Sequence, residues 1–295
     1  METLPKWIDM VVIPLLGVLI SLIFSAIIIL LIGENPIDAL NLMITGALGS
    51  TYGWGYTLYY ATNFIFTGLA VSVAFHARMF NIGGEGQAAI GGLGVAVVCL
   101  SFGWNHWVPA LLAASLGAAV FGALWAAIPA YLQAKHGSHI VITTIMFNFI
   151  GASLLNYLLV NVMRPEGSMD PATAKFAEAT HLPTLHDMLD LVGISFSKAG
   201  PANVSFVIAL LACVVVWLLI WHTRLGYQIR AYGHSESAAV YAGIKPFKII
   251  MVSMLISGAL AGMMATNNVM GEAERLVMNS TEGAGFIGIA VALMG

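Results

Sequence analysis

The chain has 295 residues, of which 59% are hydrophobic and only 8% are charged. A soluble globular protein carries about 25% charged residues, because its surface must be covered by groups that water solvates. This composition therefore indicates an integral membrane protein, and it excludes a disordered chain, a collagen-like repeat and a secreted disulfide scaffold. The formal net charge of −3 offers no basic excess for holding nucleic acid.

Long apolar runs account for most of the chain. A helix needs about 20 mostly apolar residues to cross a bilayer, and lipid offers no partner for an unpaired peptide group. The expected helical spans are about 10–32, 57–75, 83–102, 108–132, 139–162, 204–221 and 247–267. A weaker apolar stretch at about 40–49 predicts an interfacial or broken helix. The predicted fold is an all-α polytopic membrane bundle with about seven full spans and some partial segments.

Basic residues are distributed unevenly among the predicted loops. If the N-terminus lies inside, seven of the 11 lysines and arginines face the cytoplasm, and the other four lie outside among acids. The positive-inside rule therefore predicts a cytoplasmic N-terminus, an outer loop at about 163–203 and an inner loop at about 222–246.

We treat 1–295 as a single transmembrane domain. The last apolar segment, 286–295, is too short to cross a bilayer, so we expect the chain to be shortened there.

An unusual segment, Phe80-Asn-Ile-Gly-Gly-Glu-Gly-Gln87, lies where an inner turn meets the third span. Its three glycines are typical of a helix that is broken or tightly packed. Glu85 is the only acid in or beside a span away from the chain ends and the outer loop, and a charge at the bilayer centre costs about 2.5–3.5 kcal/mol. Either Asn81, Glu85 and Gln87 belong to a solute pathway or its inner gate, or Glu85 caps a helix start or pairs with Arg78.

Three spans carry polar residues spaced four apart, which places each pair on one helix face. The fifth span carries Thr143, Thr144, Asn148 and Asn156. A polar face in a membrane helix lines either a cavity or a partner helix. Uncharged hydrogen-bonding groups on several helices would suit a neutral polar solute better than an ion. The candidate pathway residues are Asn63, Thr67, Asn81, Glu85, Gln87, Thr144, Asn148, Ser253 and Ser257.

Catalytic and metal-binding patterns are weak. The sequence has no serine–histidine–acid arrangement in a water-accessible context and no Gly-x-x-x-x-Gly-Lys phosphate loop, so we expect neither enzymatic activity nor a cofactor. His181 and His186 are five apart and have no cysteine nearby, which does not favour a metal site. An ion-coupled secondary transporter that uses Glu85 is an alternative from a different functional class.

The inner loop contains the signals of one short helix of about eight residues. Ser235 is a candidate N-cap, Glu236 lies in the expected first turn, and Gly243 stands where a glycine ends a helix. Pro246 prevents continuation. A helix this short is unstable in water unless it packs on something. It is either a connector resting on the bilayer or a docking element for a cytoplasmic partner.

Several motifs together resemble the permease subunits of bacterial ABC importers in the branched-chain amino acid, ribose and nucleoside family. They lie at residues 233–244, 257–263 and 285–295. The 80–87 segment is similar to the nucleoside branch of that family. The resemblance covers most of the chain from about Leu69 onward, except for the outer loop.

The resemblance implies the fold of the larger, type II importers and a place in the bacterial cytoplasmic (inner) membrane. It implies ATP-driven import of a neutral hydroxylated solute, most readily a nucleoside and alternatively a simple sugar. Its implied partners are membrane lipid, a second similar permease, two copies of a cytoplasmic ATP-binding cassette subunit and an external solute-binding (lipo)protein. The implied ATPase-coupling residues are Gly233, Ser235, Glu236, Ala238, Ala239, Tyr241, Ala242 and Gly243.

The chain departs from the family pattern at three places. Ser237 and Val240 stand where members often carry an acid and a base, and residues 266–269 replace the usual small residues. Family chains also continue past the final motif.

Overall fold

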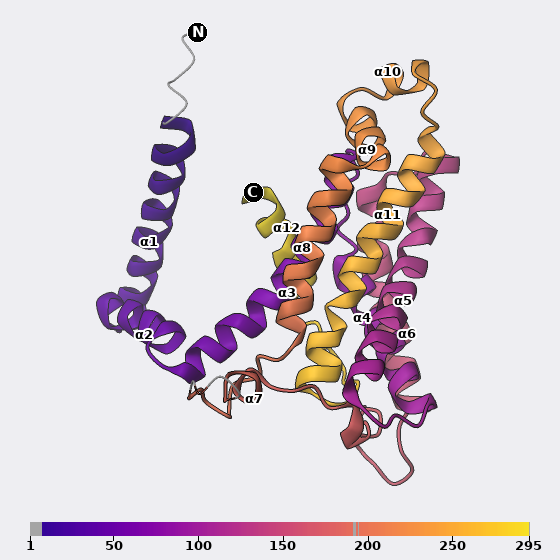
Figure 1. Cartoon of the computed structure of the whole chain (residues 1–295). Helices are drawn as coiled ribbons and strands as arrows, with labels where there is room; N and C mark the ends of the chain where they lie inside the picture. Colours follow the sequence, from indigo (N-terminus) through magenta and orange to yellow (C-terminus); the bar gives the residue numbers. More distant parts are fainter. Residues whose placement is uncertain (1–7, 191–192, 194, 295) are drawn as a thin grey trace. The chain divides into compact units, whose positions relative to one another are not determined.

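A computed structural model describes residues 8–190, 193 and 195–294 (Figure 1). It contains two compact units, Met1–Trp54 and Gly55–Gly295. The described residues form helices and connecting segments, together with two isolated β-bridges, Ala172 with Val277 and Thr184 with Asn203.

The first unit contains a π-helical turn, Ile8–Val12, followed by α1 (Ile13–Ile32) and α2 (Pro36–Leu48). The Asn35 side chain caps α2 by accepting a hydrogen bond from the Ile37 amide at 3.0 Å. Proline is favoured at the first helical position, because the N–H that it lacks would have no partner within the helix. Asparagine is favoured at the N-cap, because its side chain accepts a hydrogen bond from a free amide of the first turn. The weak apolar stretch expected at about 40–49 thus belongs to a separate helix of 13 residues.

The second unit is built on six long helices. They are α3 (Thr51–His76, which begins in the first unit), α4 (Gly84–Ser101), α5 (Trp107–His136), α6 (Ile140–Asn161), α8 (Ser205–His222) and α11 (Pro246–Met263). With α1, and with α11 extended by a π-helical segment to Glu272, seven described helices are long and apolar enough to cross a membrane. The seven expected spans are therefore confirmed. The largest differences are at the start of α3, which lies six residues earlier than predicted, and at the π-helical extension of α11.

Small residues bring α5 and α11 into direct contact. A Cβ added to Gly258 would overlap Ala126 and Gly122, and one added to Gly262 would overlap the carbonyl oxygen of Ala118. Small residues four apart allow two membrane helices to approach this closely. Figure 1 shows α11 alongside α5, with α4 and α6 next to them.

The short elements gather at the two ends of the second unit (Figure 1). One end carries the 3-10 turn Glu178–Thr180 and α7 (Leu185–Asp190), and the other carries α9 (Arg224–His234) and α10 (Glu236–Tyr241). The π-helical segment Thr266–Glu272 and α12 (Ala284–Met294) complete the described chain.

The prediction of a single helix in the 222–246 loop is wrong, because α9 precedes the expected one. Thr223 caps α9 by accepting a hydrogen bond from the Gly226 amide at 3.0 Å. Ile229 and Tyr232 bury one face of this helix. Packing against the ends of the spans stabilises a helix that its two glycines would otherwise disfavour.

Candidate functional site

The chain leaves its helical path between α3 and α4. Residues 77–83 form turns and irregular backbone, and Asn81 in this segment donates a 2.8 Å hydrogen bond to the Ser257 hydroxyl on α11. Ser257 lies 11 residues into α11, which is about 16 Å along the helix axis at the usual rise. The interruption therefore reaches deep into the bundle, where lipid and water cannot satisfy peptide groups.

Two side chains on α6 replace the missing helical hydrogen bonds. Asn148 donates from Nδ2 to the Ile82 carbonyl at 2.9 Å and accepts at Oδ1 from the Gly86 amide at 2.9 Å. Thr144 accepts from the Ile82 amide at 3.3 Å. Both side chains are buried, so these bonds are protected from exchange with water. The polar face predicted on this helix is the one that holds the interrupted segment.

Asn81 connects the interruption to α3, α4 and α11. Besides Ser257, its side chain bonds Gln87 in both directions, at 2.9 and 3.1 Å, and accepts from the Gly83 amide at 2.9 Å. Ser257 passes the chain of bonds on by donating to the Ala70 carbonyl at 2.6 Å. Because Asn81, Gln87 and Ser257 are buried and hydrogen-bonded, they fix the local geometry.

Glu85 bonds to the start of α12. Its carboxylate accepts from the amides of Gly283 at 3.0 Å and Gly285 at 2.9 Å, and also from the Thr281 hydroxyl. Free amides and the positive end of the helix dipole make a helix N-terminus a favourable place for a carboxylate. Glu85 therefore caps a helix start, and the helix that it caps lies about 200 residues away in sequence. Its place in a solute pathway stays a prediction.

A cavity of about 380 Å³ lies beside this cap. Small-molecule sites are usually concave pockets of about 300–1,000 Å³ with a few well-placed polar groups. The polar residues that line it are Glu85, Asn148, Ser153, Asn156, Asn279, Ser280 and Thr281. They come from α4, from α6 and from the segment before α12.

A second polar cluster joins α3 to the π-helical segment. Asn267 donates to the Asn63 side chain at 2.8 Å and to the Tyr59 carbonyl at 3.0 Å, and it accepts from Asn203 at 2.9 Å. Thr67, one turn after Asn63, donates to the Asn63 carbonyl at 3.0 Å. Asn267 belongs to residues 266–269, which replace the small residues that are usual in the family. Hydrogen bonds of side-chain amides are buried here instead.

The structure brings six of the nine candidate pathway residues together around the interruption, namely Asn81, Glu85, Gln87, Thr144, Asn148 and Ser257. Asn63 and Thr67 lie at the second cluster, and Ser253 is buried on α11 with no hydrogen-bond partner for its hydroxyl among the described residues. Only Glu85 and Asn148 among the nine line the cavity. Its other polar lining residues were outside the predicted set, although Asn156 continues the face of Asn148 at helical spacing.

The short helix predicted to begin after Ser235 is present as α10. Ser235 accepts from the Ala238 amide at 3.3 Å, as an N-cap does, and Gly243 has the positive φ of +83° that ends a helix. Ala239 faces inward and is buried, whereas Tyr241 is 95% exposed. The remaining predicted coupling residues, Gly233, Glu236 and Ala242, lie in or beside α9 and α10. Burial and the neighbouring Glu236 raise the pKa of the Tyr232 hydroxyl on α9.

His181 and His186, in the segment 163–203, contact different parts of the chain. His181 Nδ1 lies 3.1 Å from a carboxylate oxygen of Glu274, and His186 Nδ1 lies 2.7 Å from the Phe196 carbonyl oxygen. No group of three or more metal-ligating side chains gathers within the described ranges.

A helical membrane bundle with a segment unwound inside it, and a polar cavity at that point, has the architecture of a membrane transporter. The chain matches the family described as the branched-chain amino acid transport system permease component over residues 53–295, and it belongs to that family.

Several relatives share most of this length. The guanosine ABC transporter permease protein NupP of Bacillus subtilis is 35% identical over 98% of this chain and 81% of its own. The nucleoside ABC transporter permease protein NupB of Lactococcus lactis is 33% identical over 97% and 78%. A glucose ABC transporter permease of Haloferax volcanii is 31% identical over 100% and 77%. No solved structure gives a significant match. The chain is thus a multi-span permease component of the ABC transporter type, as the resemblance implied.

Proposed function

We propose that this permease moves nucleosides into the cell as one subunit of an ATP-driven importer. The observation that carries the proposal is the polar cavity at the helix interruption, with its amide, hydroxyl and carboxylate groups. Asparagine both donates and accepts hydrogen bonds, so it matches the base edges and ribose hydroxyls of a nucleoside. The guanosine and nucleoside permeases among its relatives support this choice of solute.

The proposed pathway runs past the cavity rather than through the buried networks. Glu85 and Asn148 face the cavity, whereas Asn81, Gln87, Thr144 and Ser257 form the hydrogen bonds of the interrupted segment. Asn63, Thr67 and Ser253 are buried elsewhere in the bundle. Alternating access would expose these groups in turn, because rocking of the helices changes which side of the cavity is open.

The proposed assembly contains a cytoplasmic ATPase, a second similar permease and an external solute-binding protein. Its place is the bacterial cytoplasmic membrane, with the N-terminus inside. Helix α10 would dock in the ATPase and transmit its closure to the spans. In this proposal the exposed side chain of Tyr241 on α10 inserts into the ATPase. Large aromatic side chains are typical anchors at interfaces between subunits.

Uptake in a host without its own nucleoside import tests the solute. The chain is co-expressed with its partner subunits, and labelled guanosine is followed with unlabelled uridine or glucose as competitor. Competition by uridine but not by glucose supports the proposal. In a second assay with labelled glucose, uptake of the sugar without competition by either nucleoside would establish the sugar alternative, which the glucose permease relative favours.

The coupling role of α10 is tested by Tyr241→Ala. This change removes an exposed side chain and no packing contact, so insertion and folding should be unchanged while uptake and transport-stimulated ATP hydrolysis fall. Tyr157→Ala is the matched control, because Tyr157 is also exposed but lies on the spanning helix α6. Equal loss in both variants, or full uptake by Tyr241→Ala, would contradict the coupling role.

Ion coupling through Glu85 is the alternative from another class. The hydrogen bonds that the Glu85 carboxylate accepts from the start of α12 favour a structural role instead. ATP depletion should stop uptake, while collapse of the proton gradient at constant ATP should leave it intact. The reverse pattern would favour the secondary transporter.

A further inference from the structure

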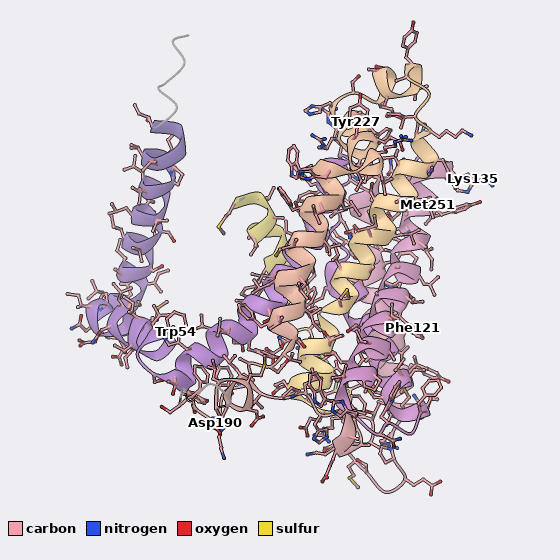
Figure 2. All side chains as sticks on the ribbon, viewed as in Figure 1. Trp54, Phe121, Lys135, Asp190, Tyr227 and Met251 are labelled. Carbon is pink, nitrogen blue, oxygen red and sulfur yellow. The ribbon has the colours of Figure 1, made fainter. Side chains whose placement is uncertain are left out.

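Basic residues dominate the end of the second unit that carries α9 and α10. They are Arg78, Lys135, Arg224, Arg230, Lys245 and Lys248, against the single acid Glu236. Figure 2 shows Lys135 near this end and Asp190 at the opposite end. An excess of cations at the ends of membrane helices attracts anionic groups at the bilayer surface.

Two of these arginines line one hollow. A pocket of about 670 Å³ is enclosed by the end of α3 with the following turn, by the end of α8 and by α9. Its lining includes Phe75, Arg78, Trp221, Arg230 and His234, and contains no acid. Both guanidinium groups can therefore meet a ligand without a competing carboxylate in the wall of the pocket.

The Arg230 guanidinium is held in position and retains free donors. It lies 4.4 Å from the centre of the Trp221 ring, which is a cation–π distance. Its Nε is buried and has no hydrogen-bond partner within the described part of the chain. A buried charged donor without a partner is costly, and a phosphate oxygen is the acceptor that a guanidinium fits best.

The helix that carries Arg230 is seated directly on the end of α3. A Cβ on Gly233 would overlap the His76 carbonyl oxygen, so α9 can approach this closely only with glycine there. The backbone contact between α3 and α9 therefore fixes two of the elements that border the pocket.

The pocket lies at the ends of two spans, since α3 ends at His76 and α8 ends at His222. The end of a spanning helix corresponds to the headgroup region of a bilayer. Phe75 and Trp221, at its rim, are 50% and 53% exposed. Exposed aromatic side chains at the ends of spans contact the interfacial region of the bilayer. A ligand that combines a phosphate with acyl chains satisfies the arginines and these aromatic faces together, which free phosphate does not.

We propose that this pocket binds the phosphate group of an anionic phospholipid from the adjoining leaflet, with Arg78 and Arg230 as its ligands. The site is separate from the cavity at Glu85 and does not depend on which solute the permease moves.

The test uses the full chain, purified in detergent and loaded with phosphatidylglycerol or phosphatidylcholine. Native mass spectrometry should show retained phosphatidylglycerol in preference to phosphatidylcholine, and the phosphatidylglycerol should raise the unfolding temperature more. The double variant Arg78→Gln, Arg230→Gln should lose this preference, by about fivefold for each arginine. Lys135→Gln, Lys248→Gln is the matched control, because it removes two positive charges from the same end but none from the pocket.

Three outcomes would overturn the proposal. They are an equal effect of both lipids on the wild-type chain, an equal loss of preference in the control, and full protection by inorganic phosphate at the same concentration. The first needs no variant, so the test does not depend on the folding of the arginine variants. The last would identify a free-anion site instead of a lipid site.

Discussion

The side chain of Asn148 makes the hydrogen bonds that a backbone peptide group would make in a continuous helix. Its carboxamide offers one donor and one acceptor, and it uses them on the Ile82 carbonyl and the Gly86 amide, which the unwound chain leaves without helical partners. A backbone group left unpaired inside a membrane bundle is costly, so a single side chain that satisfies two such groups stabilises the unwound segment.

Replacing this carboxamide should destabilise the fold. Asn148→Leu has similar size but no polar atoms, and it leaves both backbone groups unpaired at about 1–3 kcal/mol each. We expect a clear fall in the unfolding temperature of the purified chain, measured by the fluorescence of its tryptophans. Asn156→Leu is the control, because Asn156 lines the same cavity, is exposed, and its side chain hydrogen-bonds with no other described residue. Equal stability of the two variants would show that the Asn148 bonds are dispensable.

The sequence predicts the polar face that contains Asn148 but not the use made of it. Helical spacing is a local property, so Thr144 and Asn148 are readily placed on one face. Their partners at residues 82–86 are about 62 residues earlier in the chain. Periodicity does not distinguish a polar face that lines a cavity from one that braces an unwound backbone, and here Asn148 does both.

At the scale of elements, α12 depends on a close approach to the start of α4. Gly285 lies against the backbone of Glu85, where any Cβ would overlap the Glu85 amide nitrogen. The two helix starts can share the Glu85 carboxylate only because this glycine lets them meet. The cap and the glycine contact therefore form one joint between α4 and α12.

Gly285→Ala should separate this joint. The added methyl group meets rigid backbone rather than a flexible side chain, so α12 must shift and the Gly283 and Gly285 bonds to Glu85 lengthen. Overpacking of this kind typically costs about 1–3 kcal/mol. The expected results are a lower unfolding temperature and faster proteolysis of the segment before α12. Gly17→Ala, in the first unit with no atom near its added Cβ, should change neither, and equal effects would contradict the joint.

Helix α7 has a reciprocal cap that responds to pH. The Thr184 hydroxyl and amide donate to the Asp187 carboxylate at 2.8 and 3.0 Å, and the Asp187 amide donates back to the hydroxyl at 3.3 Å. These bonds, the hydroxyl's first, lower the pKa of Asp187 below its ordinary value. A lowered pKa in the folded state means that the stabilisation is fully present above the ordinary carboxyl pKa. It is lost as the pH falls through the lower, folded value.

Hydrogen exchange of the peptide that covers α7 should therefore show protection that declines in acid, after correction for intrinsic exchange rates. Asp187→Asn removes the titrating group while keeping an acceptor oxygen, so it should remove the acid dependence of protection. Asp190→Asn, at the other end of the same helix, should retain it. An unchanged acid dependence in Asp187→Asn would assign the effect to another group.

The elements differ in how far the sequence predicts them. The spans are predictable, because crossing a bilayer demands about 20 apolar residues and leaves few alternatives. The glycines at 83, 84 and 86 indicate an interruption, but its depth depends on the bond from Asn81 to Ser257, which is 176 residues away. Helix α9 is missed because glycines such as Gly226 and Gly233 disfavour a helix. Both are instead places where backbone meets backbone, which only the packed structure reveals.

At the scale of the whole molecule, charge separates the two ends of the second unit. The α9–α10 end is strongly basic, whereas residues 163–203 at the other end carry five acids and three bases. A membrane protein inserts with its basic short loops on the cytoplasmic side, so this asymmetry predicts α9 and α10 inside and α7 outside. The proposed coupling role of α10 requires the same orientation, although it rests on different residues.

Cysteine labelling in intact cells tests this orientation. Met169 and Tyr241 are each 95% exposed and lie on the two opposite ends, so Met169→Cys and Tyr241→Cys form a matched pair. The background replaces Cys99 and Cys213 with alanine, which removes a buried and a half-buried thiol. A membrane-impermeant thiol reagent should label Met169→Cys in intact cells and Tyr241→Cys only after permeabilisation. The reverse pattern would place α10 outside, where no ATPase could reach it, and would contradict both the orientation and the coupling role.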